Sequence, residues 1–277
     1  MKEILRLIGV NYRYEDIYPA LIDVCVTINE GERIAVLGGN GAGKSTFFLC
    51  CNGVLRPQSG KLFLRGQEIT YSKRDLLKLR QTVGLVFQEP DNQIIAGSVE
   101  SEVSFGPMNL YLKQDEVIMH VTSALKQMNL DGYEDRAPQY LSGGEKKRVT
   151  IADILAMKPD IMLLDEPTAS LDPENVDMLE RTLDELCKSG ITTVVSTHDV
   201  DFAYRFADRG IVFSGGAVIA DDSIDKIFAS KTVLSQAGLQ KPLLYEATEL
   251  IEKRFNKNIS KQRPKNIDEF GDYIRDI

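Results

Sequence analysis

Short runs of consecutive apolar residues recur along the chain, and amphipathic segments separate them. The runs lie in residues 83–87 (VGLVF), 160–167 (DIMLLDEP) and 191–199 (ITTVVSTHD), and they are typical of strands buried on both faces of a sheet. Residues 114–130 and 176–190 space their apolar side chains along one face of a helix. Because apolar strands alternate with helices, the pattern predicts an α/β fold with a largely parallel core sheet.

The N-terminal part has a different pattern. Residues 4–36 indicate β-strands joined by turns, and residues 60–69 alternate as in a hairpin strand. Residues 73–81 indicate a short helix. We therefore expect strands outside the parallel sheet in this part of the chain.

After about residue 220 the chain becomes helical and highly charged. Residues 243–255 form one clear amphipathic pattern, residues 256–266 indicate a polar linker, and residues 267–277 indicate a weaker final helix. We divide the chain into a main domain, residues 1–220, and a small C-terminal helical extension, residues 221–277.

The composition is that of a globular protein, with a net charge of −8 over 277 residues. This charge argues against a nucleic-acid partner, because binding to phosphates needs a clustered positive excess. We interpret the basic run Lys146, Lys147 and Arg148 as solvated helix charges. No run reaches the roughly 18 apolar residues of a membrane span, and Glu3 and Arg6 interrupt any signal-like segment. We expect the chain to stay in the cytosol, or on a membrane through a partner.

The strongest chemical signal is GGNGAGKS at residues 38–45, which matches G-x-x-x-x-G-K-[ST] between an apolar strand and a helix start. Its glycines permit backbone angles that turn several amides toward phosphate oxygens, and the helix N-terminus adds a favourable dipole. Lys44 would reach the β- and γ-phosphates and Ser45 would ligate Mg²⁺. The motif predicts ATP binding by Gly38, Gly39, Asn40, Gly41, Ala42, Gly43, Lys44, Ser45 and Thr46.

Two carboxylates end the apolar strand IMLLDEP. Asp165 stands where it can bind Mg²⁺, and Glu166 follows directly. A second carboxylate at this point can polarise an attacking water as a general base does. The pair therefore predicts nucleotide hydrolysis.

A further anion-binding element lies in LSGGEKKRV, which starts at Leu141. Ser142, Gly143 and Gly144 at a helix start form a nest of backbone amides, although the same residues also suit an ordinary N-cap. One nucleotide does not need two such nests from one chain. The second nest is therefore expected to serve a nucleotide held by another subunit, in a head-to-tail pair with two ATP molecules in its interface.

Taken together, these residues resemble the ATP-binding-cassette (ABC) ATPases over about residues 4–220, with every motif in family order. The resemblance implies a P-loop NTPase fold with an antiparallel β subdomain and a helical subdomain at about residues 85–155. LSGGE corresponds to the family signature, which usually ends in Gln where this chain has Glu145. The role of position 145 is left open.

The resemblance assigns roles to further residues. Gln88 in LVFQ corresponds to the Q-loop, near Mg²⁺ and the attacking water. Asp172 in ASLD corresponds to the D-loop, which faces the opposite subunit, and His198 in STHD to the switch that contacts the γ-phosphate. Tyr14 stands where the family stacks an aromatic ring on adenine, with Tyr12 as the competing choice.

The segment FQEPDNQ, followed by VESEVSFGPMNL, resembles the ATPases of energy-coupling-factor importers more particularly. In that group a transmembrane scaffold presents coupling helices that carry arginines, for which Glu89 and Asp91 are plausible acidic receptors. An alternative is that Asp91 only forms the turn. The resemblance implies a second ATPase subunit, identical or not, a membrane substrate-binding component, and a peripheral position on the cytoplasmic face of the membrane.

The transported substrate depends on weaker similarity. Residues 69–80 (ITYSKRDLLKLR) and the C-terminal extension resemble the cobalt and nickel branch of these importers, so we expect a cobalt or nickel ion. A vitamin importer is the first alternative. A soluble cassette ATPase of iron–sulfur cluster assembly is the second, which FQEPDNQ and the extension disfavour.

Overall fold

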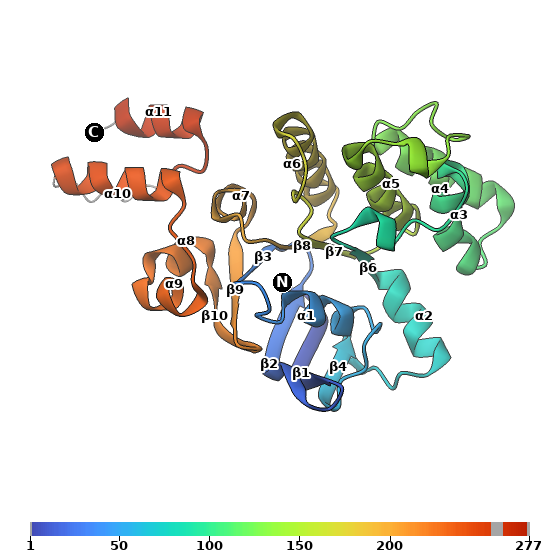
Figure 1. Ribbon diagram of the computed structural model, residues 1–277, viewed down its shortest axis with the longest axis horizontal. Coiled ribbons are helices and arrows are strands. Elements are labelled where there is room, and N and C mark those ends of the chain that lie inside the picture. The colour runs from blue at the N-terminus through green and yellow to red at the C-terminus, as the bar shows by residue number, and fades with distance from the viewer. Residues whose placement is uncertain (1, 256–262, 276–277) are drawn as a thin grey trace.

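The computed structural model describes residues 2–255 and 263–275, and its centre is a six-stranded sheet (Figure 1). The strand order is β10-β9-β3-β8-β7-β6, parallel except for the antiparallel edge pair β9 and β10. Every residue of β7 and β8 is buried, as strands covered on both faces require. The prediction of a largely parallel core sheet is confirmed. The strands are β3 (Arg33–Leu37), β6 (Val83–Val86), β7 (Ile161–Asp165), β8 (Thr192–Ser196), β9 (Arg209–Ser214) and β10 (Ala217–Ser223).

A second, antiparallel sheet has the order β2-β1-β4-β5. The helix α1 (Lys44–Cys51) lies between the two sheets, and its Phe47 and Phe48 are fully buried among side chains from both. The predicted N-terminal strands and hairpin are confirmed. The burial of Phe47 and Phe48 fixes α1 between the two sheets. The bounds are β1 (Glu3–Tyr14), β2 (Tyr18–Asn29), β4 (Ser59–Leu64) and β5 (Gln67–Glu68).

A lobe of three helices, α3 to α5, lies beyond the β6 edge of the central sheet (Figure 1). The predicted apolar face Val117, Val121, Leu125 and Met128 is buried in the core that these helices share with the sheet. No helix among the described residues is both long enough and apolar enough to cross a membrane. The helices before the C-terminal part are α2 (Lys73–Thr82), α3 (Val99–Asn109), α4 (Gln114–Gln127), α5 (Gly143–Ala156), α6 (Pro173–Lys188) and α7 (Val200–Phe206), with short 3-10 turns at Pro90–Asn92 and Pro138–Tyr140.

The C-terminal part begins later than the sequence predicted. β10 runs across residue 220 to Ser223, and Ile224, Phe228 and Leu234 from α8 and α9 are buried in the main core. The predicted boundary at residue 220 therefore falls inside a strand, because the apolar side chains of α8 and α9 complete the core rather than an appended domain. Most of the predicted polar linker, at residues 256–262, lies outside the described residues. The helices are α8 (Ile224–Ala229), α9 (Lys231–Ala237), α10 (Leu243–Phe255) and α11 (Ile267–Arg275).

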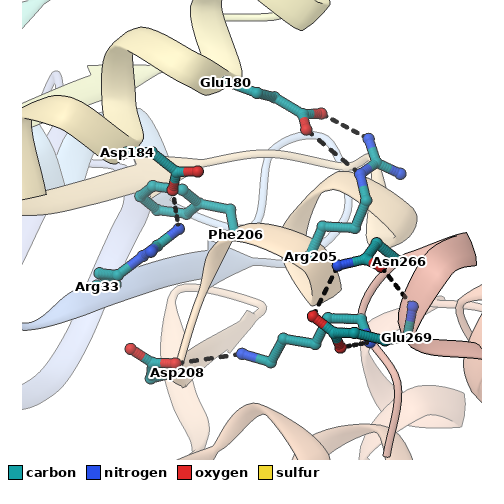
Figure 2. Close-up of a pocket in the computed structure, with 9 residues that line it drawn as sticks. Arg33, Glu180, Asp184, Arg205, Phe206, Asp208, Asn266 and Glu269 are labelled. Carbon is teal, nitrogen blue, oxygen red and sulfur yellow. Dashed lines mark hydrogen bonds and ion pairs between the residues drawn. The ribbon is translucent and has the colours of Figure 1, made fainter. Parts of the chain in front are cut away.

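The segment before α11 is attached to the main core by a lysine. Lys265 Nζ donates to the carbonyl oxygen of Ala207 at 2.7 Å and lies 3.2 Å from Asp208 Oδ1. Beside this contact, a polar cavity of about 390 Å³ lies between the main core and the start of α11. Most of its charged side chains form ion pairs with one another, as Arg205 does with Glu180 at 2.6 Å (Figure 2), while Glu269 accepts from the Asn266 side chain.

Candidate nucleotide-binding and hydrolysis site

The loop of residues 38–43 joins β3 to α1 with a backbone that only glycine adopts easily. Gly38, Gly41 and Gly43 have φ values of 144°, 76° and 109°. A Cβ on Gly38 would lie 2.4 Å from the carbonyl oxygen of Phe213, and one on Gly43 would lie 2.5 Å from that of Ala20. Two of the three glycines are therefore required by close backbone contacts as well as by their dihedral angles.

Lys44 is only 7% exposed and folds back over this loop. Its Nζ donates to the carbonyl oxygens of Gly38 at 2.8 Å and Gly39 at 3.2 Å. The same ammonium lies 3.9 Å from Glu166 Oε1. A phosphate that enters the loop would compete with these oxygens for the ammonium.

The carboxylates at the end of β7 are fixed by β8. The Ser196 hydroxyl donates to Asp165, and the Glu166 amide donates to the carbonyl and hydroxyl oxygens of Ser196, each at 3.1 Å. Glu166 Oε2 lies 2.8 Å from Nδ1 of His198, whose side chain is otherwise exposed. The fold thus brings Glu166 into contact with Lys44 and His198, two of the three other residues for which catalysis was predicted; the third, Gln88, lines the same cavity as Glu166.

The loop and the carboxylates open into one cavity of about 430 Å³. Its lining residues are Tyr14, Tyr18, Pro19, Ala20, Asn40, Gly41, Ala42, Gly43, Lys44, Ser45, Thr46, Gln88, Asp165 and Glu166. The Tyr14 hydroxyl lies 3.2 Å from Thr46 Oγ1, whereas Tyr12 packs on the core and does not line the cavity. Geometry therefore favours Tyr14 for an adenine contact. The start of β2, Tyr18 to Ala20, was missed because its sequence carries no motif.

Three oxygen-bearing side chains in this cavity suit a hard cation. Ser45 offers a hydroxyl, Gln88 an amide oxygen and Asp165 a carboxylate, and all three line the same space. Mg²⁺ prefers such oxygen ligands and completes its shell with phosphate oxygens and water. The residues predicted to hold Mg²⁺ therefore fit it, and an ion bound there would neutralise charge on the phosphates.

The second predicted nest lies outside this cavity. Ser142 caps α5: its Oγ accepts from the amide of Glu145 at 3.3 Å, and the Glu145 carboxylate accepts from the amide of Ser142 at 2.7 Å. The Tyr133 hydroxyl donates to the other Glu145 oxygen at 2.7 Å. The bond from the Ser142 amide, as the largest cause, and the bond from the Tyr133 hydroxyl lower the pKa of Glu145. Glu145 thus completes a capping box, and Ser142 and Gly143 are exposed at the start of the helix.

Asp172 caps the next helix close to this point. Its carboxylate accepts from the amide of Asn175 at 2.9 Å and from the Asn175 side chain at 2.7 Å. A Cβ on Gly144 would lie 2.6 Å from the Asn175 side chain, so the starts of α5 and α6 touch. Ser142, Gly143, Gly144 and Asp172 are therefore neighbours, but none of them lines the cavity that holds Lys44.

The comparisons with known proteins agree with this geometry. The family model for ABC transporters matches residues 21–169. The chain is 48% identical over 238 residues to the energy-coupling factor transporter ATP-binding protein EcfA of Methanothermobacter thermautotrophicus, a match that covers 86% of this chain and 76% of that protein. The chain belongs to the ABC transporter family. This ABC ATPase is also 45% identical, over 99% of both chains, to a putative ABC transporter ATP-binding protein of Methanothermobacter marburgensis.

Two solved structures are similar to the ABC ATPase. CbiO1 of Clostridium perfringens, described as part of the ABC transporter complex CbiONQ, shares 40% identity with a TM-score of 0.75 and covers 90% of this chain and 100% of its own. A dimeric ATP-binding cassette in a post-hydrolysis state, bound to ADP and phosphate, shares 30% identity with a TM-score of 0.73, over 80% and 99% of the two chains. The predicted P-loop fold and the resemblance to energy-coupling-factor ATPases are confirmed. The enzymatic activity of the family is ATP hydrolysis coupled to transport.

The basic run after the signature is where the sequence interpretation was wrong. Lys146 forms an ion pair with Asp91 at 2.7 Å, and Arg148 donates to Asn175 Oδ1 at 3.1 Å. Lys147 is 3% exposed and is not solvated at all. A count of charges along a helix could not show that α5 lies between two other segments, which cover three successive basic residues.

The acidic pair at the beginning of the Q-loop is exposed, as a docking role would need. Glu89 and Asp91 flank the start of the 3-10 turn at Pro90–Asn92. Asp91 remains 75% exposed although it pairs with Lys146. An arginine of a partner would therefore share Asp91 with this lysine, while Glu89 is free to be approached from solvent.

Proposed function

We propose that this ABC ATPase energises an energy-coupling-factor importer for cobalt or nickel ions. The likeness to CbiO1, at 40% identity over 90% of the chain, is the observation that supports this substrate best. The similarity to EcfA supports the same class of transporter. The ATPase does not touch the transported ion, so the substrate follows from its membrane partners.

In this proposal each nucleotide is bound between two chains, and both chains contribute residues to its site. One chain contributes the P-loop cavity, in which Lys44 binds the phosphates, Glu166 activates water and His198 steadies the γ-phosphate. The other chain contributes Ser142 to Gly144 and Asp172, which do not line that cavity within one chain. Each chain holds both halves, so two identical subunits are chemically sufficient, and a related sister subunit would serve equally.

The scaffold subunit is proposed to bind beside the Q-loop. Glu89 and Asp91 would accept arginines of its coupling helices in charge-assisted hydrogen bonds. Closure of the two ATPase chains would reach the scaffold through Gln88, which lies between this acidic pair and the nucleotide cavity. The ATPase would then be a peripheral protein of the cytoplasmic membrane face.

Purification from gently solubilised native membranes, followed by mass spectrometry, tests this proposal. Recovery with a scaffold subunit and a cobalt- or nickel-type membrane component is the expected result. A vitamin-binding membrane protein would keep the importer and overturn the metal. Recovery only from the soluble fraction with cluster-assembly proteins would overturn the transport role. The double variant Glu89→Gln, Asp91→Asn tests the docking site: it should weaken recovery of the scaffold and leave ATP binding intact.

A further inference from the structure

A buried ammonium group holds the first residues of the Q-loop. Lys147 Nζ donates to the carbonyl oxygens of Phe87 at 2.9 Å and of Gln88 at 2.8 Å. Both partners are backbone oxygens rather than carboxylates, so the bonds fix the course of the main chain where β6 ends. Charge-assisted bonds of this kind are stronger than neutral ones, and a buried ammonium needs such partners.

The same peptide segment is held from its other side by Gln93. Its Oε1 accepts from the amide of Phe87 at 3.1 Å, and its Nε2 donates to the carbonyl oxygen of Thr150 at 3.0 Å and to Asp153 Oδ2 at 3.1 Å. Lys147, Thr150 and Asp153 all belong to α5. The start of the Q-loop is therefore attached to α5 by donors and acceptors on both sides of the chain.

These ties join two regions that serve different nucleotides in the proposed dimer. Gln88 lines the cavity of its own chain. Gly143 begins α5 one helical turn before Lys147, at a distance of about 6 Å along the axis. A displacement of Gln88 must move α5 with it or break the bonds to Lys147.

We propose that Lys147 is a positioning residue that makes Gln88 and the signature start of α5 move as one body when nucleotide binds. Lysine suits this position because its apolar stem can be buried while its ammonium group donates to two carbonyl oxygens. The proposal rests on the two-chain arrangement proposed above, but not on the transported substrate.

The test compares Lys147→Met in the full-length ATPase with Lys126→Met, a matched change at an exposed residue of α4. Methionine keeps the stem and removes the donors. For Lys147→Met we expect ATP affinity within about twofold of the wild type and a kcat lower on the order of tenfold, which is about 1.4 kcal/mol of barrier. Lys126→Met should leave both unchanged.

Hydrogen exchange gives the readout that a merely structural role would not move. At a concentration low enough to keep the wild-type ATPase monomeric, so that no nucleotide of a second chain reaches residues 142–147, a non-hydrolysable ATP analogue with Mg²⁺ should change exchange in residues 87–93 and 142–147 together. In Lys147→Met only residues 87–93 should respond. A joint response with wild-type kcat in this variant would overturn the proposal.

A second variant guards against misfolding of the first. Gln93→Met removes the bonds that attach the other side of this peptide segment to α5. Gln93 is only half-buried, so this variant should fold more readily than Lys147→Met. It should speed exchange of the Phe87 amide and, like Lys147→Met, lower kcat. Wild-type exchange and turnover in Gln93→Met would also refute the proposed attachment of the Q-loop to α5. Failure of metal uptake by the intact transporter would instead refute the proposed substrate and leave these results standing.

Discussion

Asp153 should make the stability of this ATPase depend on pH in an unusual direction. It lies in α5, is 9% exposed, and accepts one hydrogen bond from Gln93 Nε2. Burial raises the pKa of its carboxyl from 3.8 to about 7, the bond from Gln93 opposes this rise, and nearby Glu102 adds to it. The perturbation that tests this is Asp153→Asn, because an amide oxygen can still accept from Gln93.

The sign follows from the raised pKa. The unfolded chain loses the Asp153 proton near pH 4 and the folded chain near pH 7, so the stability that a neutral carboxyl contributes is complete below pH 4 and is lost as pH rises to 7. Each pKa unit is worth about 1.36 kcal/mol, so the whole loss is on the order of 4 kcal/mol. Asparagine does not titrate and avoids this loss.

Urea unfolding at pH 5, 6, 7 and 8 measures the effect. The free energy of unfolding of Asp153→Asn, relative to the wild type, should rise by roughly 2 to 3 kcal/mol between pH 5 and pH 7 and then level off. The matched control is Asp131→Asn, an exposed position in the same lobe, which should follow the wild type at every pH. Parallel curves for Asp153→Asn and the wild type would refute the reasoning, since they would mean that the buried carboxyl is ionised throughout.

Three further substitutions test the site and the C-terminal attachment. Glu166→Gln should lower ATP turnover by roughly 10²- to 10⁴-fold, the range for loss of a general base, while nucleotide titration shows that binding persists; unchanged turnover would remove Glu166 from this role. Gly38→Ala should abolish ATP binding and lower the melting temperature, because its Cβ would meet the Phe213 carbonyl oxygen at 2.4 Å and the φ of 144° alone costs about 1–3 kcal/mol; wild-type affinity would contradict the strain argument. Lys265→Met should speed hydrogen exchange in α11 without changing ATP affinity, since Lys265 donates to the Ala207 carbonyl at 2.7 Å; equal exchange would show that other contacts hold α11.

The sequence predicted the central architecture because buried strands and amphipathic helices differ in period. The strands β6, β7 and β8, the amphipathic helix α4 and the P-loop all lie where their patterns place them. The boundary at residue 220 failed for a physical reason: the charged residues farther along the chain suggest one appended segment, whereas the apolar side chains of α8 and α9, such as Phe228, complete the core. Whether a helix is appended or integral depends on what it covers, and that is a tertiary property.

The site shows the same division between local and tertiary information. Glycine, lysine and carboxylate spacing located the P-loop and the end of β7, because phosphate and metal binding need those residue types close together in sequence. The place of Tyr18, at the start of β2, in the cavity and the burial of Lys147 could not be predicted, since both depend on segments more than 20 residues away. Glu145, which looked like a departure from the signature, proved to satisfy the capping box that a Glu or Gln at this position forms.

The corrected role of the basic run changes how the two nests relate to each other. Lys147 attaches α5 to the Q-loop, and Arg148, its neighbour, attaches α5 to Asn175, which in turn holds Asp172. Buried, directional contacts such as those of Lys147 tend to break or persist rather than stretch, so α5 is expected to move as a rigid lever between them. The helix α5 is bound to the Q-loop through Lys147 and to the Asp172 cap of α6 through Arg148 and Asn175. A change in the chain's own nucleotide cavity would therefore be transmitted to the surface that is proposed to face the second chain. That explains why a buried lysine, which is costly in a core, is used here: its two bonds hold the main chain at Phe87 and Gln88 against α5.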